Sequence, residues 1–494
     1  MNRAIARKNL FIHRFKTDSN YYIYDVNSNR IHRVDGITYK MIGDYGILSH
    51  SQIVDKYKNE FTSNKIRKEL QTLEDMVEKE GIFSVHRPKI FRFDSHSLKR
   101  KLNSNLEQII LNVTDQCNMR CKYCIFSGEY PCERTHSNQF MGFKIAKRAV
   151  DFYFSHSEGV KSHFIGFYGG EPLLNFDLIK EVAEYATKKK RKSSVHFNIC
   201  TNGILLSQKI VDFLIQNDFF LSISLNGPKN IHDRYRVFKN GKGSFDILIH
   251  NLMRIKENNE EYYKRSVRFM VTIVPPYDLL EVEHFFSSFE LMTEQPPVIN
   301  YFNNRDTTFL NLINFVDSHE SKIKKDQNSL IKKINQTLVD GRAKEEKFVV
   351  ALYGSLPKAI AGRNIASLQD VYYPHVCIPG TERLFVSAKG KLFICEKVGE
   401  HCCIGDIDRG FDFDAVLKLM NEYLSINKKY CLNCWALRFC NLCYVHMLKG
   451  EQLISKRMRE SCKQMRKETH KGLTEFTSIM EKNPDAFNFM KHRS

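Results

Sequence analysis

The chain of 494 residues is 42% hydrophobic, which is enough for more than one sizeable core. Its 75 basic and 56 acidic residues leave a net charge of +19, so an acidic peptide, a small anion or nucleic acid are the partners to consider. No apolar run approaches the ~18 residues that a membrane helix needs, and no hydrophobic segment follows the basic start of the chain, so we expect a cytoplasmic protein with no membrane partner.

Residues 1–90 are predicted to form a first unit of short strands and helices. We expect these elements at residues 21–26, 31–34, 51–58, 63–80 and 82–85, with Ser63 as a helix N-cap. The arrangement resembles the winged-helix-like recognition domain found beside many peptide-modifying enzymes. That domain docks the leader of a precursor peptide along a strand edge. A plain structural cap on the neighbouring domain is the alternative interpretation.

After an irregular linker over residues 86–104, strands and helices alternate through residues 105–310. Strands are predicted at residues 109–113, 164–168, 195–199, 220–224 and 268–274, with helices such as 143–155 and 208–216 between them. This alternation predicts an α/β fold with a parallel sheet, open or closed into a barrel. The basic run at residues 188–192 is interpreted as the cationic end of a helix. Residues 311–370 are expected to be a helical linker.

Three cysteines, Cys117, Cys121 and Cys124, lie directly after the first of these strands. Three thiolates can bind three irons of a [4Fe–4S] cube and leave the fourth iron open for chemistry. With Tyr123 as the aromatic residue, the spacing resembles the signature of the radical SAM enzymes. That resemblance implies a partial (β/α)6 TIM-like barrel, S-adenosylmethionine (SAM) as cofactor, and cleavage of SAM to a 5′-deoxyadenosyl radical. Structural cysteines or half of a zinc site are the alternative.

Further motifs at the predicted strand ends resemble those with which this family binds SAM. The residues that the resemblance assigns to SAM are Tyr168, Gly169, Gly170, Glu171, Asn202, Ser224, Asn226 and Arg236. Within this set, Glu171 is expected to hold the amino group, while Ser224 and Arg236 are expected near the carboxylate and ribose. Asn226 stands where the family usually has an aspartate, so it can keep a hydrogen-bonding role but not a charged one.

A second cysteine zone lies within residues 371–480. The chain has 14 cysteines, and such numbers in a cytosolic protein indicate metal or catalysis rather than disulfides. The spacing resembles the SPASM domain, which carries two auxiliary [4Fe–4S] clusters and would bring the total to three. The resemblance implies ligands Cys377, Cys395 and Cys443 for one cluster and Cys431, Cys434, Cys440 and Cys462 for the other. A pair of zinc ribbons is the alternative.

Several cysteines and one histidine have no assigned role. The fourth ligand of the first auxiliary cluster is left open between Cys402, Cys403, His375 and a thiolate of the substrate. Cys132 and Cys200 are interpreted as structural thiols.

The family resemblance favours an enzyme that matures a ribosomally made peptide by installing a cysteine thioether crosslink. A precursor peptide with a leader and a reducing protein such as flavodoxin or ferredoxin would be its partners. Carbon–carbon crosslinking or epimerisation of a peptide is the alternative, followed by anaerobic sulfatase maturation. Glu396 is a candidate general base. A zinc-dependent nucleic-acid-binding protein would leave the SAM-like motifs unexplained, so no nucleic acid is expected.

Overall fold

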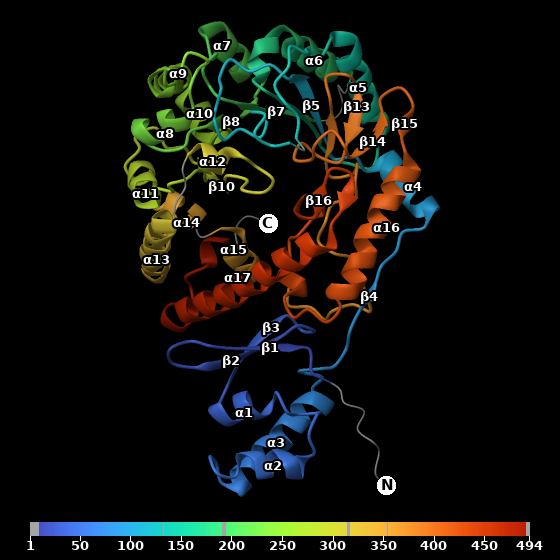
Figure 1. Ribbon diagram of the computed structural model, residues 1–494, viewed down its shortest axis with the longest axis vertical. Helices are drawn as coiled ribbons and strands as arrows, with labels where there is room; N and C mark the ends of the chain where they lie inside the picture. Colours follow the sequence, from blue (N-terminus) through green and yellow to red (C-terminus); the bar gives the residue numbers. More distant parts are fainter. Residues whose placement is uncertain (1–8, 132, 190–193, 314–316, 353, 491–494) are drawn as a thin grey trace.

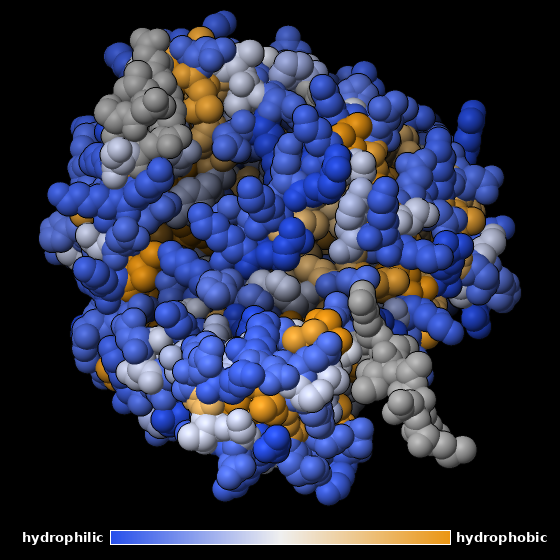
Figure 2. All heavy atoms as spheres, turned by 60° about the horizontal axis from the view of Figure 1, so that its bottom comes forward, coloured by the Kyte–Doolittle hydropathy of each residue, from blue (hydrophilic) through white to orange (hydrophobic). Residues whose placement is uncertain are grey.

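The computed structural model describes residues 9–131, 133–189, 194–313, 317–352 and 354–490 (Figure 1). A small N-terminal unit lies below a larger body in that view, and the C-terminal helices run between them. The face turned forward in Figure 2 is mostly hydrophilic, with separate hydrophobic patches. None of the described helices is both long and apolar enough to cross a membrane.

The N-terminal unit combines an antiparallel three-stranded sheet with three helices. Its elements are β1 (Ile12–Lys16), β2 (Tyr21–Asp25), β3 (Arg30–Val34), α1 (Gly36–Met41), α2 (His50–Tyr57) and α3 (Ser63–Glu78). The sheet order is β1-β2-β3. Two predicted strands and both predicted helices are confirmed. The third strand was placed wrongly: it is β1, whereas residues 82–85 are not in a strand.

The cap of α3 is a second correction, because the N-cap residue is Thr62 and not Ser63. By contrast α1 and α2 carry side-chain caps, from Asp35 and from the capping box of Ser49 with Gln52. The predicted irregular linker is also wrong in part. It contains β4 (Lys89–Ile90), which pairs with β11 (Val371–Tyr372), and helix α4 (Ser95–Ser104).

Six parallel strands form the centre of the body. In sheet order they are β5 (Gln108–Thr114), β6 (His163–Gly169), β7 (Val195–Thr201), β8 (Phe220–Ser224), β9 (Val267–Ile273) and β10 (Val298–Tyr301). The five predicted strands are confirmed, and β10 is the sixth. Along β9, buried and half-buried residues alternate, as expected when the two faces of a strand pack differently.

Helices follow the strands and cover one side of the sheet (Figure 1). They are α5 (Phe143–Ser155), η1 (Pro172–Asn175), α6 (Phe176–Lys189), α7 (Gln208–Gln216), α8 (Lys229–Tyr235), α9 (Phe245–Asn258), α10 (Glu260–Ser266) and α11 (Leu279–Ser287). The helices predicted at residues 143–155 and 208–216 have the bounds of α5 and α7. The basic run ends α6 at Lys189, and its remaining residues lie outside the described part of the chain.

The cysteine-rich region continues the same sheet, a feature that the sequence did not predict. β12 (Leu384–Val386) pairs parallel to β5, and β13 (Lys391–Phe393), β14 (Cys403–Asp406) and β15 (Gly410–Phe411) extend it antiparallel. Because β12 is hydrogen-bonded to the strand that leads into Cys117, the first cysteine loop and the segment around Cys395 are attached to one continuous sheet.

The remaining elements are mainly helical. They are α12 (Phe309–Leu312), α13 (Asp317–Val339), α14 (Lys347–Leu352), α15 (Ser355–Ala361), α16 (Phe413–Tyr430), η2 (Leu437–Phe439), η3 (Tyr444–His446), β16 (Leu448–Lys449), β17 (Gln452–Leu453), α17 (Ser455–Lys482) and η4 (Asn488–Met490). Helix α17 passes beside the N-terminal sheet (Figure 1), where Glu481 accepts hydrogen bonds from Thr17, Asn20 and Tyr22 at 2.9, 2.7 and 2.6 Å.

Candidate functional site

The loop of Cys117, Cys121 and Cys124 is held against the end of β6 by two glycines. A Cβ on Gly169 would lie 2.2 Å from the carbonyl oxygen of Thr114, and one on Gly170 would lie 2.4 Å from that of Gln116. Gly169 also has a φ of +147°, which favours glycine. The Gly170 and Glu171 amides donate to these same carbonyls at 2.9 Å. The glycines therefore position the cysteine loop as well as the SAM-like motif.

Burial makes the three thiols weak acids in the absence of a positive partner. It raises the pKa of Cys117 and of Cys124 to about 12 and also raises that of Cys121. The Arg236 guanidinium opposes this at all three sulfurs. Arg236 is only 7% exposed, and its Nε has no hydrogen-bond partner. The buried Arg236 cation would balance the negative charge of a cluster bound by three thiolates. Its free Nε–H could donate to the carboxylate of a ligand bound there.

Glu171 lies beside this cation and is fully buried. It accepts hydrogen bonds from the Leu173 amide at 3.1 Å, the Thr201 hydroxyl at 2.7 Å and the Asn202 amide at 2.7 Å. Burial raises the pKa of Glu171, and these three donors act in the opposite direction. The carboxylate is thus fixed in orientation by the ends of β6 and β7.

The aromatic residue of the cysteine motif connects these parts. The Tyr123 hydroxyl accepts hydrogen bonds from Asn226 Nδ2 at 2.9 Å and from Arg236 Nη1 at 2.8 Å. Asn226 Oδ1 in turn accepts from the Thr272 amide at 3.2 Å. Because both ends of the Asn226 amide are engaged, this residue is suited to position Tyr123 and Arg236. Of the remaining expected residues, Asn202 donates to Asn118 at 2.8 Å, and Ser224 is half-buried at the end of β8.

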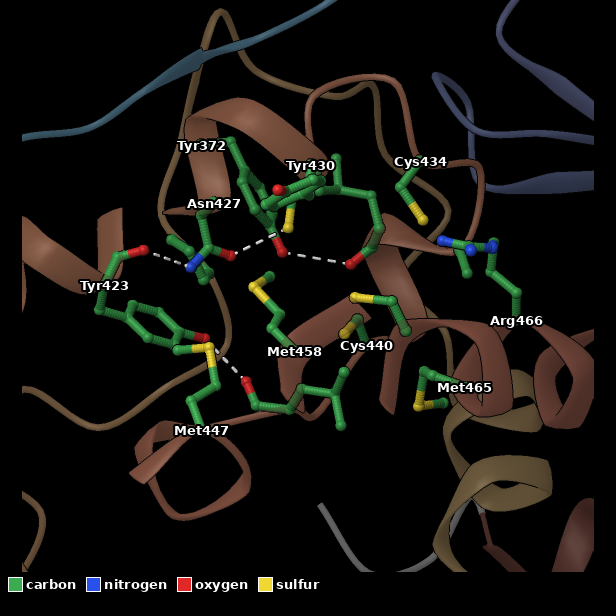
Figure 3. A pocket seen from close by; sticks show the side chains of 16 residues that line it. Tyr372, Tyr423, Asn427, Tyr430, Cys434, Cys440, Met447, Met458, Met465 and Arg466 are labelled. Atoms are coloured by element: carbon green, nitrogen blue, oxygen red, sulfur yellow. Dashed lines mark hydrogen bonds between the residues drawn. The ribbon is translucent and has the colours of Figure 1, made fainter. Parts of the chain in front are cut away.

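Four cysteines of the second zone face a common pocket (Figure 3). This Cys431 group consists of Cys431, Cys434, Cys440 and Cys462, which come from the end of α16, the segment around η2, and α17. Met447, Met458 and Met465 complete a sulfur-rich wall, and Arg466 closes one side. The structure thereby brings together the residues that the sequence assigns to one auxiliary cluster.

The three cysteines assigned to the other auxiliary cluster, Cys377, Cys395 and Cys443, are called the Cys377 group. Cys395 and Cys443 lie close enough to Cys377 to raise its pKa. The Cys377 thiol donates to Glu382 Oε2 at 3.0 Å. His446, which the sequence analysis did not identify, places Nδ1 3.6 Å from the Cys443 sulfur and accepts from the Cys443 amide at 3.1 Å. Its position three residues after Cys443 is the sequence feature that could have identified it.

The candidates for a fourth ligand lie in different places. Cys402 is buried and lines the large cavity described next. Cys403 is exposed, and its thiol donates to the Gly405 carbonyl at 3.2 Å. His375 is exposed beside the ring of Tyr372. Cys200 is half-buried at the end of β7, and Cys132 lies outside the described residues.

A cavity of about 540 Å³ separates the two zones. Tyr168 and Glu133 line it from the central domain, and Glu396, Lys397, Cys402 and His446 line it from the cysteine-rich region. Burial raises the pKa of Glu133 to about 7. Glu396 Oε1 instead pairs with Arg383 at 3.0 Å, while its Oε2 is buried without a partner.

Arg134 contacts both regions beside this cavity. It lies over the rings of Phe126 and Phe385 and donates to the Glu396 carbonyl at 2.8 Å. In the described part of the chain, no three His, Cys, Asp or Glu side chains are grouped closely enough to hold one metal ion.

The family match falls on the domain that holds the first cysteine loop. A family model described as the Radical SAM superfamily matches residues 111–287. This stretch begins in β5 and ends in α11. The chain carries a radical SAM domain.

Relatives of this chain include two named bacterial enzymes. The cysteine-type anaerobic sulfatase-maturating enzyme of Clostridium novyi is 31% identical over 160 residues, 32% of this chain and 42% of the relative. The radical SAM cyclopropyl synthase TigE of Paramaledivibacter caminithermalis is 25% identical over 268 residues, 51% of this chain and 54% of the relative. These matches span only about half of each relative's length.

A solved structure shares the fold of this chain. Native anSMEcpe with bound AdoMet and Kp18Cys peptide superposes with a TM-score of 0.55 at 16% identity, covering 78% of this chain and 99% of the other. The predicted α/β radical SAM fold is therefore confirmed. The roles of the individual site residues stay predictions.

Proposed function

We propose that this chain is a peptide maturase that uses its radical SAM domain to install a cysteine thioether crosslink in a ribosomally made precursor peptide. The observation that carries this proposal is the shared cavity. Its walls come from the radical SAM domain on one side and from the segments around Cys395 and Cys443 on the other. A peptide side chain in this cavity would face both cysteine zones at once.

The side chains around the first cysteine loop suit the two cofactors of the proposed reaction. Cys117, Cys121 and Cys124 would hold a [4Fe–4S] cluster, with Glu171 on the amino group of SAM and Arg236 on its carboxylate. When both are bound, the cluster and SAM together supply a 5′-deoxyadenosyl radical that removes hydrogen from carbon. Tyr168, Gly169, Gly170, Asn202 and Ser224 would line the SAM site, and Asn226 would position Tyr123 and Arg236.

The Cys377 and Cys431 groups would each hold a further [4Fe–4S] cluster, as in a SPASM domain, for a total of three. Four cysteines around the Cys431 pocket provide a full ligand set. In the Cys377 group three cysteines leave one position for a substrate thiolate or for a further protein ligand. Of the protein candidates, Cys402 is the one that lines the shared cavity.

A carboxylate in the cavity would accept the proton of the donor cysteine thiol. Glu133 suits this step because its pKa of about 7 lets it change protonation near neutral pH. Glu396, the candidate from the sequence, is less suited because Arg383 already binds one of its oxygens. The proton transfer breaks an S–H bond and forms an O–H bond without any redox change.

The N-terminal unit would recognise the leader of the precursor. β1 and β3 are the two edges of its sheet, but β1 lies against the C-terminal region, where His13 stacks on Trp435 at 3.4 Å. This leaves β3 as the edge available to an added strand. Arg30 and Arg33 are exposed on β3, which suits an acidic leader. Flavodoxin or ferredoxin would supply electrons.

Carbon–carbon crosslinking or epimerisation of a peptide is the second candidate. The similarity to a cyclopropyl synthase favours chemistry at carbon. Sulfatase maturation is the third candidate, favoured by the names of other relatives.

Metal content and product analysis test the proposal. After anaerobic reconstitution, iron should be about twelve per chain and fall to about eight in the triple variant C117A/C121A/C124A, with loss of SAM cleavage. Coexpression with a short cysteine-containing peptide encoded beside the gene should give a product that has lost two hydrogens and no longer reacts with iodoacetamide at the donor cysteine.

Each alternative leaves a different product. A carbon–carbon crosslink leaves the cysteine open to alkylation, epimerisation leaves the mass unchanged, and sulfatase maturation gives formylglycine. Zinc in place of iron, or no loss of SAM cleavage in the triple variant, contradicts the proposal.

A further inference from the structure

The Cys377 and Cys431 groups face charged side chains of opposite sign. Neighbouring charge changes the reduction potential of an iron–sulfur cluster. The inference drawn from this difference rests on the proposed function, in which both groups hold such clusters.

Arg466 supplies the positive charge on the Cys431 side. It lies one helical turn after Cys462 on α17, and Figure 3 shows its guanidinium turned toward the Cys434 sulfur. It lines the same pocket as Cys431, Cys440 and Cys462. Among the described residues, no hydrogen bond or ion pair engages this guanidinium with another group. Its charge is therefore available to the sulfur pocket.

Glu382 supplies a negative charge on the Cys377 side. Its Oε2 lies 3.0 Å from the Cys377 sulfur. The Glu396 carboxylate, beside Cys395 in the chain, is instead paired with Arg383 at 3.0 Å. The negative charge in contact with a sulfur of this group is therefore that of Glu382.

We propose that Arg466 raises, and Glu382 lowers, the reduction potentials of the clusters held by their respective cysteine groups. Reduction adds one negative charge, which a nearby cation stabilises and a nearby carboxylate destabilises. The two side chains would thereby set the reduction potential of a cluster on the Cys431 side above that of a cluster on the Cys377 side.

The test is a potentiometric titration followed by electron paramagnetic resonance on the reconstituted full-length chain. The C117A/C121A/C124A background removes the signal of the first cluster, and additional C377A/C395A/C443A substitutions identify which step belongs to the Cys431 group. The cluster of the Cys431 group should have the higher reduction potential. R466Q should lower this potential, and E382Q should raise the reduction potential of the cluster of the Cys377 group. We expect each change to alter the ratio of reduced to oxidised cluster at fixed potential by about tenfold, or about 59 mV.

Matched variants separate local charge from general effects. R466K keeps the positive charge and should retain most of the potential. R459Q and E460Q change exposed residues on the same helix and should shift neither step. Unchanged potentials in R466Q and E382Q at full iron content contradict this inference alone. Iron well below eight per chain in the parent background contradicts the proposed function itself, and this inference with it.

Discussion

The first cysteine loop and the Cys431 group are built in different ways. Cys117, Cys121 and Cys124 lie in one short loop, and a buried polar network centred on Tyr123, Glu171 and Arg236 holds the surrounding strand ends together. The Cys431 group gathers residues from α16 to α17 around an apolar pocket rich in methionine. The first site should therefore be sensitive to single polar changes, and the second to packing.

Removing the buried cation of the first site should have the largest effect. R236M leaves the Tyr123 hydroxyl and the buried thiols without their positive partner, which costs about 3–5 kcal/mol in comparable buried pairs. We expect SAM cleavage to fall by about a hundredfold or more, since each 1.36 kcal/mol is tenfold. Anaerobic assay of 5′-deoxyadenosine measures this effect.

Two further variants make that result specific. R236K should restore part of the activity because it keeps a charge, whereas K239Q, on an exposed lysine nearby, should have no effect. Full SAM cleavage in R236M would show that the first site does not depend on its buried polar network, and the contrast with the Cys431 group would fail.

Crowding the first loop should damage it while sparing the second zone. G170A places a Cβ 2.4 Å from the Gln116 carbonyl, so we expect a loss of about 1–3 kcal/mol in stability. Iron should fall from about twelve toward about eight per chain, because the loss is confined to one cluster. Iron analysis with thermal unfolding measures both effects.

The control for this substitution is G142A, since a Cβ there has no atom within 4 Å. Equal iron loss from both zones in G170A would mean that the shared sheet transmits the damage, and that the two sites are less independent than their construction indicates.

The cavity between the two zones should give the protein a pH-dependent stability. The pKa of Glu133 is raised from 4.5 to about 7 by burial, so folding favours its protonated form. Its contribution is fully present below about pH 4.5 and is lost as the pH rises through about 7. E133Q should remove this part of the pH dependence and be more stable than the wild type at pH 8. Melting temperatures measured across pH 5 to 8 test this, with E158Q as an exposed control.

More of the first site than of the second could be anticipated from the sequence, because the motifs of the first site are local; the roles of its residues stay predictions. Strand ends followed by Gly169, Gly170 and Glu171 fix a turn and a carboxylate within a few residues. By contrast, the sequence gives no sign that β12 pairs with β5, because pairing between distant strands depends on the whole packing of the sheet. Glu133 and Arg466 were missed for the same reason. The raised pKa of Glu133 comes from burial by segments that are distant in the chain. The position of Arg466 matters because it lies one helical turn after Cys462.

The smallest expected effect concerns the contact between the N-terminal sheet and α17. E481L would remove the acceptor that Thr17, Asn20 and Tyr22 share, at a cost of about 0.5–1.5 kcal/mol, because Glu481 is exposed and water can replace part of its contacts. Trp435 is the single tryptophan of the chain and stacks on His13 of β1, so its fluorescence reports on the same interface. We expect an emission change at a lower denaturant concentration in E481L than in the wild type, with iron content unchanged. Concurrent loss of iron from the Cys431 group would instead show that α17 transmits strain from the N-terminal unit to Cys462, and that packing at the second site extends to the domain that would bind the leader.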